Sequence, residues 1–263
     1  MDEIKKKLVS IFMDKVYLKS PNVEGSNPNH DGASGDWLHL QFGQEKDSAN
    51  KADFWGYECK NDTSSKTTWG DWTANYYIFE DQNLEINRPQ FLNIFGTPNI
   101  KKNNRYSWSG TEVPSYHEQI TPFGQFMFVD KLSDISIFYD FEMDQRDAKE
   151  TIVPSHLHKR NLLLAKWTGY KINKTTRKTS LEEKVENKFN QKGFFKCKME
   201  NGVYKEIIFG EPISFETWIE YLKKGDIYFD SGMYDGNPRP YSQWRSNNTF
   251  WDKLLLDSYP KNT

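Results

Sequence analysis

The chain has 263 residues, of which 36% are hydrophobic and 16% aromatic, so we expect one large domain or two closely joined lobes packed largely by aromatic rings. Its 35 basic and 37 acidic side chains give a formal net charge of −2, which argues against a protein that coats nucleic acid with its whole surface but is compatible with a local basic patch. The absence of any run of ~18 apolar residues excludes a membrane-spanning helix, and two cysteines are too few for a disulfide scaffold, so we expect a cytoplasmic protein.

The first predicted element is an amphipathic helix over residues 3–18, because the apolar side chains from Ile4 to Val16 fall on one stripe. A polar loop rich in glycine and asparagine follows over residues 20–35. A short helix is predicted over residues 36–42, and a polar connection leads from it to the next strand.

That strand carries the most informative stretch of the chain, with Asp53 followed five positions later by Glu58 and then by Lys60. Side chains alternate along a strand, so Glu58 and Lys60 point to the same face, about 6.6 Å apart at their Cα atoms. Asp53 has the wrong parity for that face in a continuous strand. Gly56 predicts a bulge or sharp turn that would bring Asp53 back beside Glu58.

This set of side chains suits the hydrolysis of a phosphodiester. Two converging carboxylates form a site for a hard divalent cation, most simply Mg²⁺, which can polarise a phosphoryl oxygen and lower the pKa of a bound water. A neighbouring lysine can stabilise the charge of the transition state or orient the attacking water. The alternative is a solvated strand face, but the flanking aromatic residues Phe54, Trp55 and Tyr57 indicate a strand that is buried on one side.

The stretch Gly35 to Gly43, Asn50 and the stretch Lys51 to Lys60 together resemble the core of the MvaI/BcnI-type restriction endonucleases. These enzymes belong to the MutH-like branch of the PD-(D/E)XK nucleases. The resemblance implies that Asp53 and Glu58 are ligands of Mg²⁺ and that Lys60 is the catalytic lysine. It further implies that the loop after the first helix approaches DNA, where Lys19 would contact a phosphate.

One departure from the family pattern concerns the short helix, where a glutamate is usual four residues before the closing glycine. This chain has His39 at that position. Three alternatives stay open: His39 takes a metal-binding or water-orienting role, Glu45 compensates, or the position is dispensable. We include His39 among the candidate catalytic residues.

The middle of the chain predicts further strands and one well-marked helix. Residues 61–68 read as a loop. A helix over 88–95 is expected to end at Gly96, and a basic and aromatic loop over 101–110 contains Arg105, a candidate for contact with phosphate or stacking on DNA. Further strands are expected over residues 73–79, 125–130, 135–142 and 161–172.

The last third predicts two capped helices and a hairpin. Ser180 and Glu183 form a capping box before a helix that extends to residue 190. Asn201-Gly202 predicts a tight turn between two strands, and a second helix is expected from Ser214 to Gly225, with a strand over 226–230.

Polar residues that suit base recognition alternate near the C-terminus. Arginine reads guanine, and asparagine or glutamine reads adenine, so a ribbon carrying them at period two would present several on one face. This segment resembles the DNA-reading portion of MutH/MvaI-type enzymes but lacks their Gly and His. The candidate DNA contacts are Arg239, Tyr241, Gln243, Arg245, Asn248 and Thr249. A surface hairpin with exposed polar residues is the alternative.

Together these features predict an α/β (mixed α+β) fold in which a central mixed sheet is flanked by helices and two lobes surround a DNA cleft. We expect one restriction-endonuclease-like domain over 1–263, with a catalytic lobe at about 1–150 and a DNA-recognition lobe at about 151–263. The expected function is that of a Mg²⁺-dependent type II restriction endonuclease acting on double-stranded DNA, with a CC-x-GG-like site and a monomeric state implied by the resemblance. A GATC-like site and a dimer stay open, as do a MutH-like repair nickase and a catalytically inactive DNA-binding module.

Overall fold

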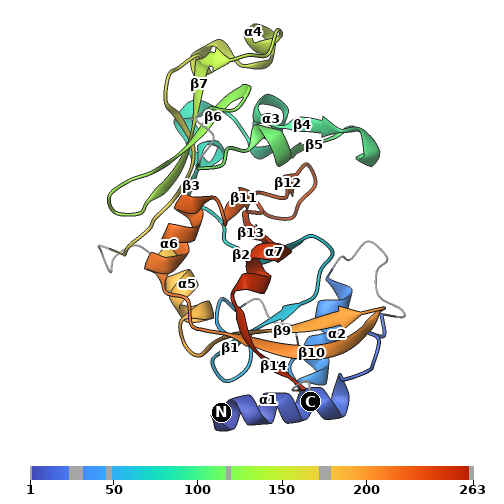
Figure 1. Ribbon diagram of the computed structural model, residues 1–263. Coiled ribbons are helices and arrows are strands. Elements are labelled where there is room, and N and C mark those ends of the chain that lie inside the picture. The colour runs from blue at the N-terminus through green and yellow to red at the C-terminus, as the bar shows by residue number, and fades with distance from the viewer. Residues whose placement is uncertain (1, 24–31, 46–48, 117–119, 172–178, 261–263) are drawn as a thin grey trace. The chain divides into compact units, whose positions relative to one another are not determined.

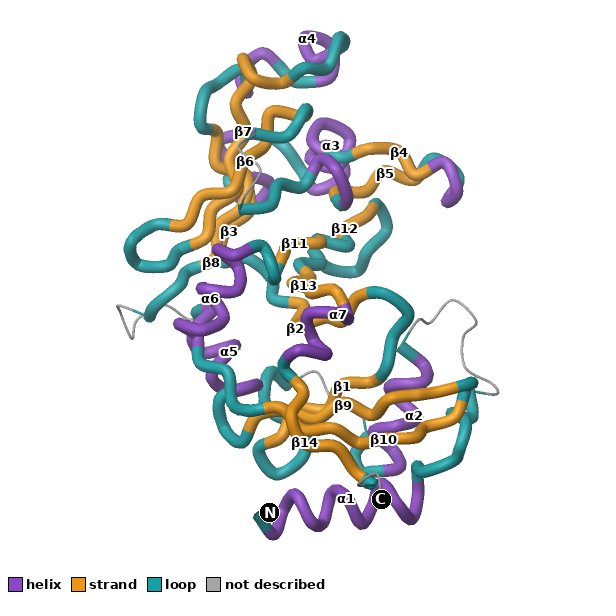
Figure 2. Tube along the Cα trace, in the orientation of Figure 1, coloured by secondary structure: helices purple, strands orange, loops and turns teal. Residues whose placement is uncertain are grey.

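The structure is a computed structural model that describes residues 2–23, 32–45, 49–116, 120–171 and 179–260 (Figures 1 and 2). The helices of these residues are α1 (Glu3–Lys15), α2 (Ala33–Gln41), α3 (Arg88–Phe95), α4 (Lys149–Ile152), α5 (Leu181–Phe189), α6 (Phe215–Lys224) and α7 (Asn248–Lys253). Their strands are β1 (Tyr57–Asn61), β2 (Lys66–Asp71), β3 (Tyr76–Tyr77), β4 (Thr97–Asn99), β5 (Arg105–Trp108), β6 (Phe123–Val129), β7 (Ile135–Asp144), β8 (Leu162–Trp167), β9 (Gly193–Glu200), β10 (Val203–Gly210), β11 (Tyr228–Asp230), β12 (Met233–Tyr234), β13 (Gln243–Asn247) and β14 (Leu255–Tyr259). Within the described ranges, every helix is too short or too polar to cross a bilayer. The mixed α/β fold class is confirmed.

The chain forms two compact units that are interleaved in sequence. Unit 1 consists of Met1–Thr67, Lys184–Phe215 and Asn247–Thr263, and unit 2 consists of Thr68–Glu183 and Glu216–Ser246. These units do not coincide with the expected lobes at about 1–150 and 151–263. The reason is that the strands of unit 1 find their partners in distant parts of the chain, so no single boundary separates the two units.

Unit 1 is built on a four-stranded sheet in the order β1-β9-β10-β14. β1 pairs with β9 in parallel, with Glu58 opposite Phe194 and Lys60 opposite Lys196. β9 and β10 form the predicted hairpin, and Asn201 and Gly202 both take the positive φ that its tight turn needs (51° and 79°). The hairpin expected at this turn is therefore confirmed.

Helices α1 and α2 cover one face of this sheet. Asp2 caps α1 by accepting hydrogen bonds from the backbone N–H groups of Ile4 and Lys5 at 2.7 and 2.9 Å. Side chains alternate across a strand, so Cys59 of β1 enters the core beneath the two helices while Glu58 turns to the opposite face. The core between the helices and the sheet contains Leu8, Phe12, Val16, Leu38, Phe42, Phe54, Tyr57, Cys59, Phe195, Cys197, Ile207 and Phe209.

Unit 2 contains sheets in the orders β3-β8-β7-β6, β11-β13-β2 and β12-β5-β4. Its core is aromatic, as the composition predicts. The ring of Trp167 packs edge-on against Phe229 and Trp244, at centroid distances of 4.9 and 5.4 Å, and Trp218 packs on Trp244 at 5.3 Å. Such edge-to-face contacts add to the free energy gained from burying the rings themselves.

Two local predictions are wrong. Within the expected strand 73–79, only Tyr76–Tyr77 pair with a neighbour, and the chain then enters a 3₁₀ turn at Ile78–Glu80. The expected loop over 61–68 instead contains the start of β2 at Lys66. A short polar segment of this kind becomes a strand through its place beside β13, which the local sequence does not reveal.

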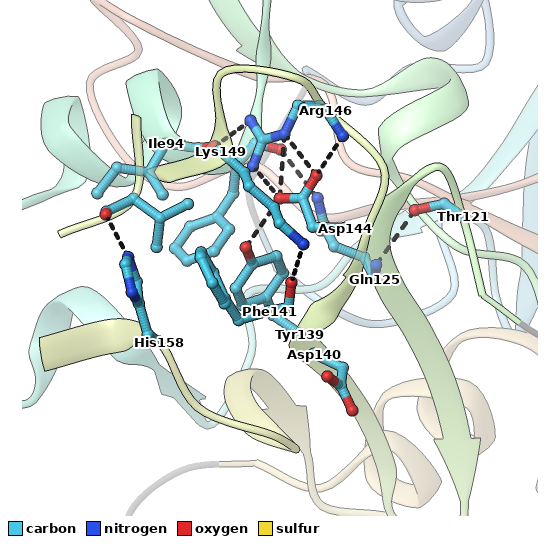
Figure 3. Close-up of polar contacts among 12 residues, drawn as sticks. Ile94, Thr121, Gln125, Tyr139, Asp140, Phe141, Asp144, Arg146, Lys149 and His158 are labelled. Atoms are coloured by element: carbon cyan, nitrogen blue, oxygen red, sulfur yellow. Dashed lines mark hydrogen bonds and ion pairs between the residues drawn. The ribbon is translucent and has the colours of Figure 1, made fainter. Parts of the chain in front are cut away.

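A buried ion pair closes the β6–β7 hairpin of unit 2 (Figure 3). The Arg146 guanidinium donates to the Asp144 carboxylate at 2.6 Å and to the backbone oxygen of Ile94, the penultimate residue of α3, at 2.7 Å. Tyr139 also donates its hydroxyl to Asp144, at 2.8 Å. Burial opposes ionisation of Asp144, but these hydrogen bonds outweigh it and hold its pKa below the ordinary value.

We predict that Arg146→Ala lowers the free energy of unfolding by about 3–5 kcal/mol, because it leaves a buried carboxylate without its partner. The matched control is Arg160→Ala, which breaks an exposed pair with Glu142 on the same hairpin and is expected to cost less than about 1 kcal/mol. Urea titration followed by tryptophan fluorescence measures both. Equal losses in the two variants would contradict the role assigned to the buried pair.

Candidate active site

The bend expected beside Gly56 is present as a two-residue turn between Phe54 and Tyr57. These two residues exchange backbone hydrogen bonds at 2.9 Å in both directions, and the two residues between them, Trp55 and Gly56, have φ values of 49° and 95°. Such a turn needs positive φ at both central positions, which glycine accepts and tryptophan adopts only at a cost. The turn returns Asp53 alongside β1, where its Oδ2 accepts the N–H of Cys59 at 2.9 Å.

Glu58 and Lys60 lie on the face of the sheet opposite the α1–α2 core. Both side chains are buried, with exposed fractions of 2% and 8% for the two residues. The Lys60 ammonium donates to Glu58 Oε1 at 2.9 Å. It also lies 5.2 Å from the ring centroid of Phe189 on α5 and 5.8 Å from that of Trp251 on α7, so aromatic faces complete the surroundings of this cation.

Lys188 on α5 brings a second ammonium group to the same carboxylate. Its Nζ lies 3.1 Å from Glu58 Oε1. Lys188 is not among the predicted site residues, because nothing in the local sequence separates it from the other lysine of its helix. The tertiary signal is the parallel pairing of β1 with β9, since α5 leads directly into β9 and therefore ends beside Glu58.

The two lysines decide the charge state of Glu58. Burial opposes its ionisation, but the charges and hydrogen bonds of Lys60 and Lys188 outweigh burial and hold the pKa of Glu58 below the ordinary value. Burial in turn lowers the pKa of Lys60, against the opposing charge of Glu58. Both ammonium groups approach Oε1, whereas Oε2 is buried without a hydrogen-bond partner among the described residues.

Asp53 is held close to this charged group. Burial, followed by the negative charge of Glu58, raises the pKa of Asp53 to about 7. The two carboxylates therefore repel one another in the metal-free protein, and a cation placed between them would relieve that repulsion. An unused buried oxygen on Glu58 and a carboxyl with a raised pKa beside it fit a hard divalent cation. Among the described residues, no group of three or more His, Cys, Asp or Glu side chains is arranged to hold a metal ion.

His39 of α2 completes this side of the site. Its Nε2 lies 3.8 Å from Asp53 Oδ2, and its Nδ1 is buried without a hydrogen-bond partner in the described part of the chain. Burial lowers the pKa of His39, so the ring is neutral near pH 7. Glu45, the other candidate for the family's helix glutamate, is exposed in the segment after α2. His39 is thus the residue that contacts Asp53.

Four of the predicted DNA-reading residues lie in unit 2, on or before β13. Burial alternates along this strand, with Ser242, Trp244 and Ser246 buried and Gln243 and Arg245 turned outward, as the period-two pattern predicts. Arg245 contacts Gln243 and the carboxylate of Asp230, and Arg239 pairs with Asp71 at 2.7 Å. The guanidinium of Arg239 lies 4.8 Å from the ring centroid of Tyr241.

The remaining predicted DNA contacts are dispersed. Asn248 accepts hydrogen bonds from the hydroxyls of Thr63 and Thr67, at 3.1 and 2.8 Å, so it ties α7 to the segment before β2. Thr249 is exposed on the first turn of α7. Lys19, after α1, donates to the backbone oxygen of Asp14 at 3.0 Å. In unit 2, the guanidinium of Arg105 lies over the ring of Tyr234.

The chain is similar to known restriction endonucleases in sequence and in fold. The family described as LlaMI restriction endonuclease matches residues 17–259 of the chain. The Type II restriction enzyme ScrFI of Lactococcus lactis subsp. cremoris is 41% identical over 271 aligned positions, which cover 98% of this chain and 100% of that enzyme. A solved complex of restriction endonuclease MvaI with cognate DNA has a TM-score of 0.60 at 13% identity and covers 97% of this chain and 98% of that one, which shows a shared fold.

We predict that Asp53→Asn stabilises the metal-free protein considerably more at pH 8 than at pH 5. A carboxyl whose pKa is about 7 in the folded state and 3.8 when unfolded destabilises the fold as pH rises through this range, by up to roughly 4 kcal/mol. Urea titrations with a chelator at both pH values measure the difference. The exposed Asp14, exchanged in Asp14→Asn, is the control, and a gain at pH 8 no larger than that of the control would contradict the prediction.

Proposed function

The chain belongs to the LlaMI restriction endonuclease family and is a type II restriction endonuclease, and we propose that it cleaves both strands of DNA through a Mg²⁺-dependent centre formed by Asp53, Glu58 and Lys60. The observation that carries this proposal is the buried Glu58, which two lysines keep ionised through one oxygen while the other oxygen has no hydrogen-bond partner in the described residues. A purely structural ion pair would have no need of an unsatisfied buried oxygen.

Asp53 and Glu58 would hold the metal ion. When bound, Mg²⁺ supplies the polarisation of a phosphoryl oxygen and lowers the pKa of a water molecule. The protein contributes an ionised Glu58 at neutral pH and an Asp53 that gives up its proton readily once a cation is near, because its raised pKa arises from burial and from the charge of Glu58.

Lys60 is proposed to stabilise the charge that develops on the scissile phosphate. Its ammonium is buried between Glu58 and the rings of Phe189 and Trp251, so it is poorly hydrated and interacts more strongly with a phosphate than a solvated lysine would. Its lowered pKa also lets it exchange a proton with the attacking water more easily than an exposed lysine.

Lys188 and His39 are proposed as positioning residues. Lys188 shares Glu58 Oε1 with Lys60, so it keeps Glu58 charged when Lys60 turns toward substrate. His39 takes the position of the family's helix glutamate, and as a neutral imidazole 3.8 Å from Asp53 it can orient that carboxylate or a water molecule beside it.

Base recognition is proposed for the outer face of β13 and the loop before it. Arg239 and Arg245 would read guanine, and their pairing with Asp71 and Asp230 holds each guanidinium in a defined orientation before DNA binds. Two guanine-reading arginines support a site rich in G·C pairs, such as the CC-x-GG type. We further propose that a cytoplasmic monomer cuts the two strands in turn.

We predict that Glu58→Gln and Lys60→Met each reduce the cleavage of unmethylated plasmid by at least about 10²–10³-fold in Mg²⁺, because each removes a charge used in the transition state. Lys192→Gln, on the exposed segment that follows α5, is the control and is expected to cleave normally. Unaltered cleavage by both active-site variants would refute the proposed centre. Mapping the ends of digested phage DNA would identify the site, and products with a single nick would favour a nickase.

We also predict that Lys188→Met lowers the cleavage rate about 10-fold or more and shifts the acidic limb of the pH–rate profile to higher pH. The shift follows because Lys188 helps to keep the pKa of Glu58 low, so its loss raises the pH at which Glu58 becomes charged. Lys188→Arg should restore the wild-type limb. An unshifted limb in Lys188→Met would mean that the lysine acts on folding alone.

A further inference from the structure

The hairpin of β4 and β5 forms a projection from unit 2, which we call the finger (Thr97–Trp108). β4 and β5 pair antiparallel, with Thr97 opposite Ser107 and Asn99 opposite Arg105. Figures 1 and 2 show the hairpin extending away from α3, with its turn at the far end.

The base of the finger is firmly anchored. Trp108 is fully buried and donates its indole N–H to Gln125 Oε1 at 2.8 Å. The hydroxyl of Thr97 donates to the buried Glu112 at 3.0 Å. At Gly96, an added Cβ would lie only 2.4 Å from the backbone oxygen of Ser107, so the two strands approach too closely here for any other residue. These contacts give the finger a fixed direction within unit 2.

The tip of the finger presents an aliphatic side chain to solvent. Ile100 is 84% exposed, the highest value among the large apolar side chains of the described residues. The turn around it is well formed, because the Asn99 side chain accepts the N–H of Lys101 at 3.1 Å and Asn103 and Asn104 both take positive φ. An ordered turn that holds an isoleucine in water keeps an apolar side chain available to a partner that can cover it, and covering it would be favourable.

The charges around Ile100 indicate what covers it. The finger carries Lys101, Lys102 and Arg105 and has no acidic residue, although the chain as a whole has a net charge of −2. The guanidinium carbon of Arg105 lies 3.3 Å from the ring centroid of Tyr234, and its Nε is buried without a hydrogen-bond partner in the described residues. A cationic tip with an apolar point complements a polyanion with an apolar interior, which describes a DNA duplex.

We propose that the finger enters a groove of the DNA duplex and that Ile100 inserts between adjacent base pairs while Lys101 and Lys102 contact the flanking phosphates. This inference depends on the enzyme acting on duplex DNA, but not on which residues form the catalytic centre. An aliphatic wedge at a base step is covered by the bases on either side, and the partial loss of stacking bends the duplex toward the protein. Because the base of the finger is anchored, insertion of Ile100 at a base step would fix the position of unit 2 along the DNA relative to that step.

The test uses the full-length enzyme in Ca²⁺ and a duplex that contains the mapped cleavage site, with 2-aminopurine placed in turn at each position. The wild-type enzyme is expected to raise 2-aminopurine fluorescence several-fold at one base step, which reports unstacking. Ile100→Ala is expected to abolish this rise and to weaken binding about tenfold. The control Leu256→Ala removes another exposed aliphatic side chain (66% exposed), in unit 1, and should change neither signal.

The double variant Lys101→Gln/Lys102→Gln separates the wedge from the phosphate contacts. It is expected to reduce the slope of log affinity against log salt by about two, and to keep the fluorescence rise at saturating protein. A rise that persists in Ile100→Ala would overturn the proposal. The proposal would also be overturned if the wild-type enzyme raised 2-aminopurine fluorescence at no position but still cleaved plasmid. That result would refute the insertion without refuting the nuclease function. Altered self-association without altered DNA binding in Ile100→Ala would instead assign the tip to a protein contact.

Discussion

The shared contact of Lys60 and Lys188 with Glu58 Oε1 is the interaction on which the candidate site depends. A carboxylate this deeply buried would normally be protonated, and the two cations reverse that preference. Asp53 bears the cost of this arrangement, because burial and then the negative charge of Glu58 raise its pKa to about 7. The protein therefore holds an electrostatically unfavourable arrangement in its metal-free state, which is how active sites commonly trade stability for chemistry.

The parallel pairing of β1 with β9 explains both the site and the interleaving of the two units. Parallel neighbours need a crossover connection, and here the connection contains the whole segment Thr68–Glu183 of unit 2 before the chain returns through α5. The returning helix delivers Lys188 and Phe189 to the face that carries Glu58 and Lys60. The inserted segment packs against Glu216–Ser246, the other part of unit 2, where Trp167 contacts Phe229 and Trp244 in a shared aromatic core.

The chain has a net charge of −2, and the cations proposed to contact DNA lie in two different electrostatic surroundings. Arginines before and on β13 are paired with aspartates, which orients them and limits their attraction to phosphate. The finger, by contrast, concentrates three cations with no acidic neighbour in its own sequence. Sequence reading and groove insertion would thus be assigned to separate elements of unit 2, and a near-neutral total charge is no objection to either.

The sequence by itself determined the features that depend on near neighbours. It predicted α3 to the residue, the capping box at Ser180, the turn at Asn201-Gly202, the bend beside Gly56 and the outward face of β13, because caps, turns and alternation are set by residues a few positions apart. Only the tertiary structure decided that Lys188 reaches Glu58, that a polar segment becomes β2, that Asn248 ties down a loop and that the two units interleave. Each of these depends on strands that pair across long stretches of chain, and no local pattern encodes which distant partner a strand will find.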